Sequence, residues 1–191
     1  MRSSKVNRTT RETAVKIEIS LDGNGEASLD FSPEFMRHML TALVVHSEFD
    51  VTLDAQGDLQ HHLIEDIALC FGKAIRESID DVNVIGRFGD AIIPMDCSLA
   101  LVAVDICNRP YSVIDLCSKE SRVEDTLVQD IEHFLNSLAA SLAASIHVKV
   151  LYGENDHHKI EAAFKALGIA LKQATRFRDE AVVLSSSKGV L

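Results

Sequence analysis

A short histidine-rich motif occurs twice in this chain and is the strongest constraint on its fold. His-His-Leu-Ile-Glu at residues 61–65 recurs as His-His-Lys-Ile-Glu at residues 157–161, a shift of 96 residues that keeps both histidines and the glutamate. Each copy follows a glycine and acidic turn signal and precedes a helix-like run. A third histidine precedes each copy, His38 by 23 residues and His133 by 24. Self-similarity at one fixed period indicates a duplicated unit.

The repeat predicts two tandem copies of one unit, at residues 1–90 and 91–191, which form one compact functional unit. A length of 191 residues suits this reading. Alternating apolar residues predict strands, and apolar residues at helical spacing predict helices, in both halves. This mixture predicts an α+β fold in which the sheets pack against helices. The expected strands are 14–21, 49–55, 100–106, 111–116 and 146–151, and the expected helices are 34–45, 61–78, 126–144 and 156–174.

Charge and composition exclude several kinds of partner. With 19 basic and 29 acidic side chains, the net charge of -10 argues against a general nucleic-acid binder, although it leaves room for a local anion pocket. We expect no membrane partner, because no apolar run reaches the roughly 18 residues that a membrane span needs, and we find no targeting segment. The four cysteines form no CxxC pair and indicate reduced thiols, so we expect a cytoplasmic protein. They are Cys70, Cys97, Cys107 and Cys117.

The spacing of the motif suits metal binding. On a helix, residues i and i+4 share a face, so His61 and Glu65 can converge while His62 points elsewhere. Diverging neighbours suit two separate ions better than one, and we expect one ligand cluster from each copy. Imidazole and carboxylate ligands without thiolates favour Mn²⁺, with Fe²⁺, Co²⁺ or Zn²⁺ as alternatives. The candidate ligands are His38, His61, His62, Glu65, His133, His157, His158 and Glu161. Two further histidines, His46 and His147, have no partner in the repeat, and both a structural and a functional role stay open for them.

A second, weaker constellation is basic. Arg87 and Arg109 lie in short loops, and the last residues contain Ser186 and Lys188 next to a glycine. Such groups can bind the oxygens of a phosphate, although a flexible polar tail is the ordinary interpretation of the last segment. Glu12, taken alone, is an exposed charge at a strand end.

Together these segments resemble the imidazoleglycerol-phosphate dehydratase family, nearly from end to end. The resemblance rests on residues 8–13, 21–25, 38–40, 61–66, 87–89, 94–96, 109–111, 132–134, 153–166 and 186–191, in this order and spacing. It implies a duplicated α/β unit, two Mn²⁺ ions per site and a homo-oligomeric cage of 24 chains. It also implies that the eight candidate ligands hold the metal and that Arg87, Arg109, Ser186 and Lys188 contact the substrate phosphate. Glu12 matches the acid/base glutamate of the family.

The resemblance implies a metal-dependent hydro-lyase of histidine biosynthesis. Its reaction removes water from D-erythro-imidazoleglycerol phosphate and yields imidazole-acetol phosphate. The proton that is lost lies next to no carbonyl, so it is not acidic. Two divalent ions would hold the substrate ring as an imidazolate, which can expel the neighbouring hydroxyl through a diazafulvene-like intermediate. Glu12 would move the proton on the adjacent carbon, and the phosphate contacts would orient the small-molecule substrate.

This chain also departs from the family pattern. Arg37 replaces an aspartate that usually precedes the first ligand, Ala42 replaces a glutamine, and Cys97 replaces a glutamate, while the segment before His61 is a few residues shorter. These changes leave an alternative open, a catalytically impaired, metal-dependent relative that still forms the assembly. A third hypothesis is a lyase that acts on a related phosphorylated azole.

Overall fold

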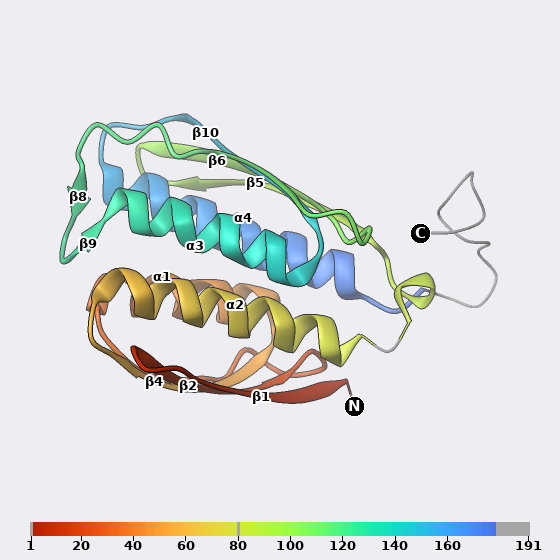
Figure 1. Ribbon diagram of the computed structural model, residues 1–191. Coiled ribbons are helices and arrows are strands. Elements are labelled where there is room, and N and C mark those ends of the chain that lie inside the picture. The colour runs from red at the N-terminus through yellow and green to blue at the C-terminus, as the bar shows by residue number, and fades with distance from the viewer. Residues whose placement is uncertain (1, 80, 179–191) are drawn as a thin grey trace.

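The computed structural model describes residues 2–79 and 81–178 as four layers, with two pairs of helices between two sheets (Figure 1). The first half of the chain supplies one sheet and the two helices that cover it. The second half supplies the other sheet and the other two helices. The helix pairs face one another in the middle of the molecule, so apolar side chains of both halves meet there. No helix within the described residues is long and apolar enough to cross a membrane.

The two halves have the same topology. The elements of the first half are β1 (Ser3–Thr9), β2 (Thr13–Ser20), β3 (Ala27–Asp30), α1 (Glu34–Ser47), β4 (Asp50–Gly57) and α2 (Gln60–Ser78). Those of the second half are β5 (Phe88–Met95), β6 (Ser98–Asp105), β7 (Tyr111–Asp115), α3 (Val128–Leu142), β10 (Ser145–Tyr152) and α4 (Asp156–Thr175). The strand orders β1-β2-β4-β3 and β5-β6-β10-β7 match strand for strand. In both sheets only the last pair is parallel. The predicted α+β class with two similar units is therefore confirmed.

Three short elements have no counterpart in this scheme. A 3-10 turn, Val82–Val84, lies between the halves, and β8 (Arg122–Val123) and β9 (Thr126–Leu127) form a small hairpin before α3. The hairpin lies beside the beginning of α1, because the carboxylate of Asp125 accepts hydrogen bonds from the backbone amides of Glu34 and Phe35 at 2.7 and 3.0 Å. Since α1 has no capping side chain of its own at Pro33, a residue of the second half caps a helix of the first.

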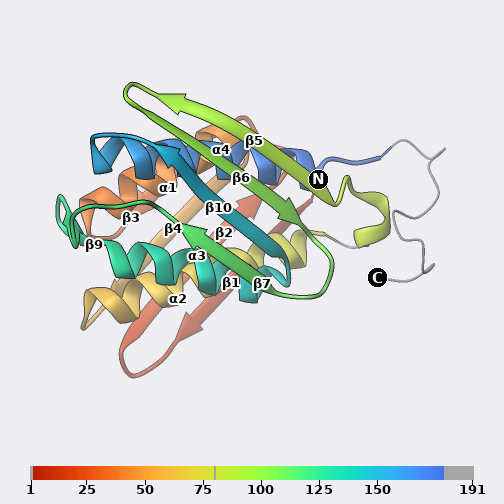
Figure 2. The same ribbon diagram turned by 90° about the horizontal axis from the view of Figure 1, so that it is seen from above.

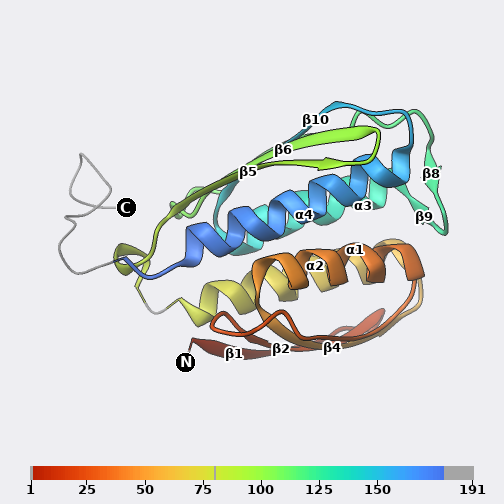
Figure 3. The ribbon, with the colours of Figure 1, turned by 180° about the vertical axis from the view of Figure 1, so that it is seen from behind.

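Helices of different halves pack on one another, α1 on α4 and α2 on α3 (Figures 2 and 3). Glycine permits the close approach at both crossings. A Cβ on Gly168 of α4 would lie 2.5 Å from the backbone oxygen of Leu43 in α1. A Cβ on Gly72 of α2 would lie 2.9 Å from the backbone oxygen of Leu138 in α3. These glycines are themselves 96 residues apart, so the repeat extends to the helix crossings.

The sequence-based assignment located the helices, the inner strands and β7 but missed β1, β3 and β5. All three missed strands are edge strands that pair with one neighbour only. In β1 only Val6 is buried, so the chain carries almost no apolar alternation there. In β5, Pro94 interrupts the pattern, which a strand tolerates best at an edge. The apolar period is strong in every inner strand, whereas among the edge strands of the two sheets only β7 carries a clear alternation.

Candidate active site

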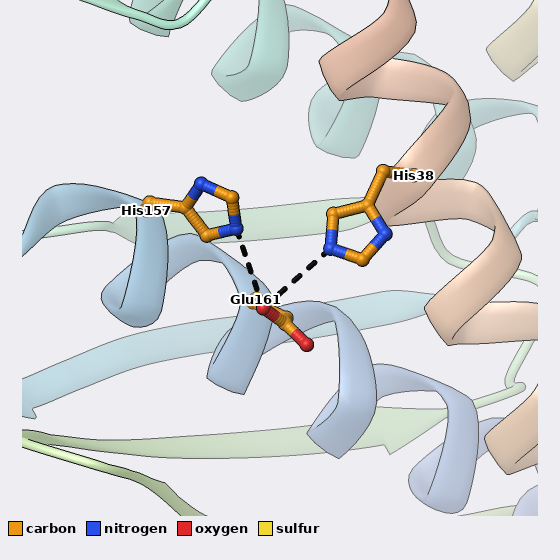
Figure 4. A group of neighbouring side chains, drawn as sticks. All are labelled: His38, His157 and Glu161. Atoms are coloured by element: carbon orange, nitrogen blue, oxygen red, sulfur yellow. Dashed lines mark ion pairs between the residues drawn. The ribbon is translucent and has the colours of Figure 1, made fainter.

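Two groups of side chains that could hold a metal ion lie at the helix crossings. The first, called the Glu161 group, contains His38 of α1 with His157 and Glu161 of α4 (Figure 4). Oε2 of Glu161 lies 3.6 Å from Nε2 of His38 and 3.4 Å from Nε2 of His157. His157 and Glu161 share a face because they are four residues apart at the beginning of α4.

The second, called the Glu65 group, contains His61 and Glu65 of α2 with His133 of α3. Nε2 of His133 lies 3.5 Å from Oε2 of Glu65, and the rings of His61 and His133 stack with centroids 4.9 Å apart. In each group the candidate ligand atoms lie within 4.8 Å of one another. The two groups therefore have the same composition, two imidazoles and one carboxylate.

The arrangement differs from the expectation of one cluster per copy. Each group takes one histidine from one half and a histidine and glutamate from the other half. The reason is the helix packing, because α1 lies on α4 rather than on the motif helix of its own half. The duplicated motif thus produces two mixed groups.

The electrostatics of the Glu161 carboxylate are set by a lysine. Burial alone would raise the pKa of Glu161, but the Lys165 ammonium, at 2.8 Å, and the neighbouring histidines lower it. The carboxylate is therefore ionised at neutral pH, as a metal ligand must be.

The first histidine of each motif, His61 or His157, also has a partner at its other ring nitrogen, Nδ1. Nδ1 of His61 lies 2.7 Å from Oδ1 of Asp130, a carboxylate that is 1% exposed. Nδ1 of His157 lies 3.3 Å from Oε1 of Glu124. An acceptor at Nδ1 selects the tautomer whose Nε2 carries the free lone pair, which is the form that binds a metal.

The second histidine of each motif points away from its group. Nδ1 of His62 lies 3.0 Å from Oδ1 of Asp58 and 3.8 Å from Oε2 of Glu12. The hydrogen bond to Asp58 and the charges of Glu12, Asp58 and Glu65 raise the pKa of His62. The divergence predicted from the helical spacing is thus present. It also places Glu12, in the turn between β1 and β2, beside a motif histidine.

The second half repeats this arrangement with different residues. His158 has Oδ2 of Asp96 at 3.5 Å from Nε2 and Sγ of Cys97 at 3.7 Å from Nδ1. Hydrogen bonds with the Ser98 hydroxyl, with two backbone amides and with His158 lower the pKa of the Cys97 thiol to about 6. The turn between β5 and β6 therefore corresponds to the turn that carries Glu12, and Cys97 contacts a candidate ligand directly.

The donor set fits a divalent cation. Nε2 of His133 is buried and has no hydrogen-bond partner within residues 2–79 and 81–178. A buried polar atom without a partner costs about 1–3 kcal/mol, and an ion between His133 and Glu65 would remove that cost. Two imidazoles and one carboxylate per group also leave coordination positions for further ligands.

Two of the four predicted phosphate residues, Arg87 and Arg109, lie at the other end of the second sheet. Arg87 is buried, and its guanidinium pairs with Asp105 at 2.6 and 3.0 Å. This contact raises the pKa of Arg87. Arg109 is exposed near the start of β10, where its backbone oxygen accepts a hydrogen bond from Ser145. Ser186 and Lys188 lie outside the described residues.

The histidines outside the repeat are not part of either group. Nδ1 of His46 lies 2.8 Å from the backbone oxygen of Ala42, which is a helical contact. His147 lies on the outer face of the second sheet with its ring 6.2 Å from that of Tyr111. Arg37, where the family usually has aspartate, forms an ion pair with Glu34 rather than with a ligand.

Sequence reasoning missed several acidic residues of the site, among them Glu124, Asp125 and Asp130. The repeat could not reveal them, because Asp130 has Phe35 at its matching distance before the first histidine and the hairpin that carries the other two has no counterpart. The only available signal was the position of Asp130, three residues before His133 and so on the same helix face.

Fold and site together define a class, a duplicated α+β protein with two mixed histidine–glutamate groups at the crossings of its helices. Comparison with known proteins makes this more specific. The family model of imidazoleglycerol-phosphate dehydratase matches residues 32–171. The enzyme of that name from Methanocella arvoryzae is 44% identical over 194 aligned residues that cover all of both chains. The one from Chloroherpeton thalassium is 42% identical and covers all of this chain and 98% of its own length.

Solved structures of this family have the same fold as this chain. A crystal structure of IGPD from Pyrococcus furiosus superposes with a TM-score of 0.85 at 41% identity and covers 97% of this chain and 100% of its own. The imidazoleglycerol-phosphate dehydratase from Staphylococcus aureus has a TM-score of 0.82 at 32% identity and covers 92% of this chain and 99% of its own. This chain belongs to the imidazoleglycerol-phosphate dehydratase family, a family of lyases.

Proposed function

We propose that this protein dehydrates D-erythro-imidazoleglycerol phosphate to imidazole-acetol phosphate in histidine biosynthesis. The observation that carries the proposal is the pair of histidine–glutamate groups, together with Glu12 beside His62. The full-length likeness to relatives named for this activity supports it. It assigns the eight candidate ligands to two Mn²⁺ ions, with His62 and His158 completing the coordination, and it assigns Arg87, Arg109, Ser186 and Lys188 to the substrate phosphate.

Different residues of this chain would have different roles in the reaction. When bound, the divalent ions would supply the Lewis acidity that favours the imidazolate form of the substrate ring. Glu12 would move the proton on the carbon chain, because its carboxylate is exposed and lies next to a motif histidine. The two arginines would orient the substrate through its phosphate, far from the reacting carbons.

The distance between the motif histidines and Arg87 supports a homo-oligomer. The resemblance implies a cage of 24 chains. His157 begins α4, whereas the amide of Arg87 donates to the backbone oxygen of Ala174 near its end. A helix rises by about 1.5 Å per residue, which puts about 25 Å between His157 and Ala174. A three-carbon phosphate ester of imidazole is much shorter. The arginines of one chain would therefore serve the histidines of another.

The outer face of the second sheet also supports assembly. Ile92, Tyr111 and Val113 are 56%, 65% and 44% exposed on that face, whereas the outer face of the first sheet carries mostly charged and polar side chains such as Lys16 and Asp54. These side chains lie on the two edge strands of the sheet, β5 and β7, and exposed apolar side chains on one face are typical of an interaction surface. We assign this face to another copy of the chain.

Two further assignments complete the proposal. The two halves, expected at 1–90 and 91–191 and divided in the structure before β5 at Phe88, are two copies of one ancestral unit. The matched strand orders and the paired glycines of the helix crossings support this. The protein works in the cytoplasm, which the free cysteines favour, since reduced thiols are typical of a reducing compartment.

A turnover assay on chelated and Mn²⁺-restored protein tests the function. We expect imidazole-acetol phosphate only with restored metal. Glu12→Gln should lower kcat by about 10²–10⁴-fold with metal content unchanged, whereas Glu18→Gln, on the same sheet and paired with Lys5, should have no effect. Metal-replete protein that assembles but gives no product would support the impaired relative instead.

Mixing variants tests the shared site. Glu12→Gln and Arg109→Ala chains, each inactive alone, should regain part of the activity when they are unfolded and refolded together. Light scattering should give the mass of 24 chains for the active form. A mixture as inactive as its components would contradict a site built from different chains.

A further inference from the structure

The two metal groups occupy matching positions of the two halves but differ in the residue behind the motif histidine. Asp130 precedes His133 by three residues, and Phe35 precedes His38 by three, so each lies on the helix face that meets the opposite motif. The buried carboxylate of Asp130 lies 2.7 Å from Nδ1 of His61. At the other group, the ring of Phe35 packs edge-on against His157, with centroids 5.0 Å apart.

The carboxylate ligands also differ in their neighbours. Nζ of Lys165 lies 2.8 Å from Oε1 of Glu161, and both side chains are largely buried. The matching position in the first half is Leu69, which carries no charge. Hence Glu65 keeps its full charge for a cation, whereas Glu161 shares its charge with an ammonium.

Glu124 compensates only in part for the missing aspartate at the Glu161 group. Its carboxylate lies 3.3 Å from Nδ1 of His157, but its side chain is 62% exposed. Water screens a charge at that exposure, whereas Asp130 is only 1% exposed and its carboxylate is therefore screened far less, even though the side chain of His61 is 49% exposed. The Glu65 group therefore combines a stronger imidazole donor with an uncompensated carboxylate.

Resting on the proposed metal-dependent function, we propose that the two metal positions are not equivalent. The Glu65 group binds the first divalent ion and holds it tightly. The Glu161 group binds the second ion more weakly and releases it first. Asp130 sets the affinity of the first position by orienting His61, and Lys165 lowers the affinity of the second by competing for Glu161. Loss of a carboxylate behind a ligand histidine typically costs 10–100-fold in metal affinity, so the two dissociation constants should differ by about that factor.

The test is a titration of metal-free, full-length protein with Mn²⁺, in which electron paramagnetic resonance measures the free ion. Wild-type protein should bind two ions per chain in two resolved steps. Asp130→Asn, which keeps the shape of the side chain, should weaken the tight step by about 10–100-fold and leave the weak step unchanged. Lys165→Met should tighten the weak step and leave the tight one. Asp54→Asn and Lys16→Met, on the outer face of the first sheet, are matched controls that should change neither.

Two equal steps in the wild type, or a weakening of the weak step by Asp130→Asn, would overturn the inference. If Asp130→Asn does not fold by circular dichroism, Lys165→Met still decides, since an unchanged weak step contradicts the competition. The titration does not use turnover. Two resolved binding steps in a protein without activity would support this inference and contradict the proposed function. Two equal binding steps in an active enzyme would contradict this inference and support the proposed function.

Discussion

Nε2 of His38 lies 3.6 Å from Oε2 of Glu161, although the two residues belong to different halves of the chain. The contact exists because α1 packs on α4 at a glycine. The Glu65 group has the same relation to the packing of α2 on α3. Each candidate metal position thus lies at the interface between the two halves. The stability of the fold and the geometry of the site therefore depend on the same contacts.

The helix crossings should not tolerate a methyl group. Alanine in place of glycine normally stabilises a helix by about 1 kcal/mol. In Gly168→Ala, however, the Cβ would meet the backbone oxygen of Leu43 at 2.5 Å, and a backbone oxygen cannot rotate away. We expect a net destabilisation of about 1–3 kcal/mol, measured by urea unfolding, and a looser Glu161 group, measured by Mn²⁺ binding. Gly72→Ala should act likewise on the Glu65 group. A rise in stability in either variant would contradict the close approach.

The cap that the hairpin provides should be measurable. Burial would raise the pKa of Asp125, but its hydrogen bonds to the amides of Phe35 and Glu34 lower it. Asp125→Ala removes both acceptors and should cost about 1 kcal/mol of unfolding free energy. Asp125→Asn, which keeps one acceptor oxygen, should cost less. Equal stability of all three proteins in thermal unfolding would mean that α1 does not depend on the second half for its cap.

Acid should weaken the beginning of α4. Burial alone would raise the pKa of Asp156, but Lys159, the Ser118 hydroxyl and the backbone amides of the loop that precedes β8 hold it at about 2. Because the folded-state pKa lies below the ordinary 3.8, the contribution to stability is present above pH 4 and is lost as the pH falls towards 2. It amounts to about 2 kcal/mol.

A double variant that removes both charges distinguishes the Asp156–Lys159 ion pair from general acid denaturation. Asp156→Asn leaves the Lys159 ammonium buried without its charge partner, and we expect a loss of about 3–5 kcal/mol at pH 7. Asp156→Asn combined with Lys159→Met should recover most of it and should lose less stability than the wild type between pH 4 and pH 2. Parallel stability curves for wild type and double variant across that range would contradict the assignment.

Metal removal should lower the melting temperature. An ion at 100 times its dissociation constant stabilises the folded state by about 2.7 kcal/mol. His133→Ala should reduce the shift that Mn²⁺ causes in differential scanning fluorimetry, because it removes a ligand of the Glu65 group. His46→Ala should keep the full shift, since His46 belongs to neither group and its Nδ1 faces the backbone oxygen of Ala42. The same shift in both variants would argue against the Glu65 group as a metal site.

Local pattern explains how much of this protein could be predicted. The helices, the inner strands and β7 carry strong apolar periods. The motif that repeats at 96 residues, with His38 and His133 at similar distances before its two copies, identified the duplication and all the residues of both groups. The spacing of His61 and Glu65 also indicated that these two side chains converge and that His62 diverges, since these relations depend only on helix geometry. The edge strands β1, β3 and β5 and the acidic residues behind the ligands carry no such period.

The sequence by itself determined the duplicated unit, the α+β class and the residue types that offer nitrogen and oxygen to a cation. The tertiary structure alone decided that each group mixes the two halves and that Asp130 lies behind His61 while Phe35 lies behind His157. It also decided that Arg87 lies at the opposite end of α4 from His157. The physical reason is the sequence separation of the interacting residues. Positions along one helix or strand follow from its repeat geometry, whereas the choice of packing partner depends on close contacts, such as that of Gly168 with Leu43, between residues far apart in the chain.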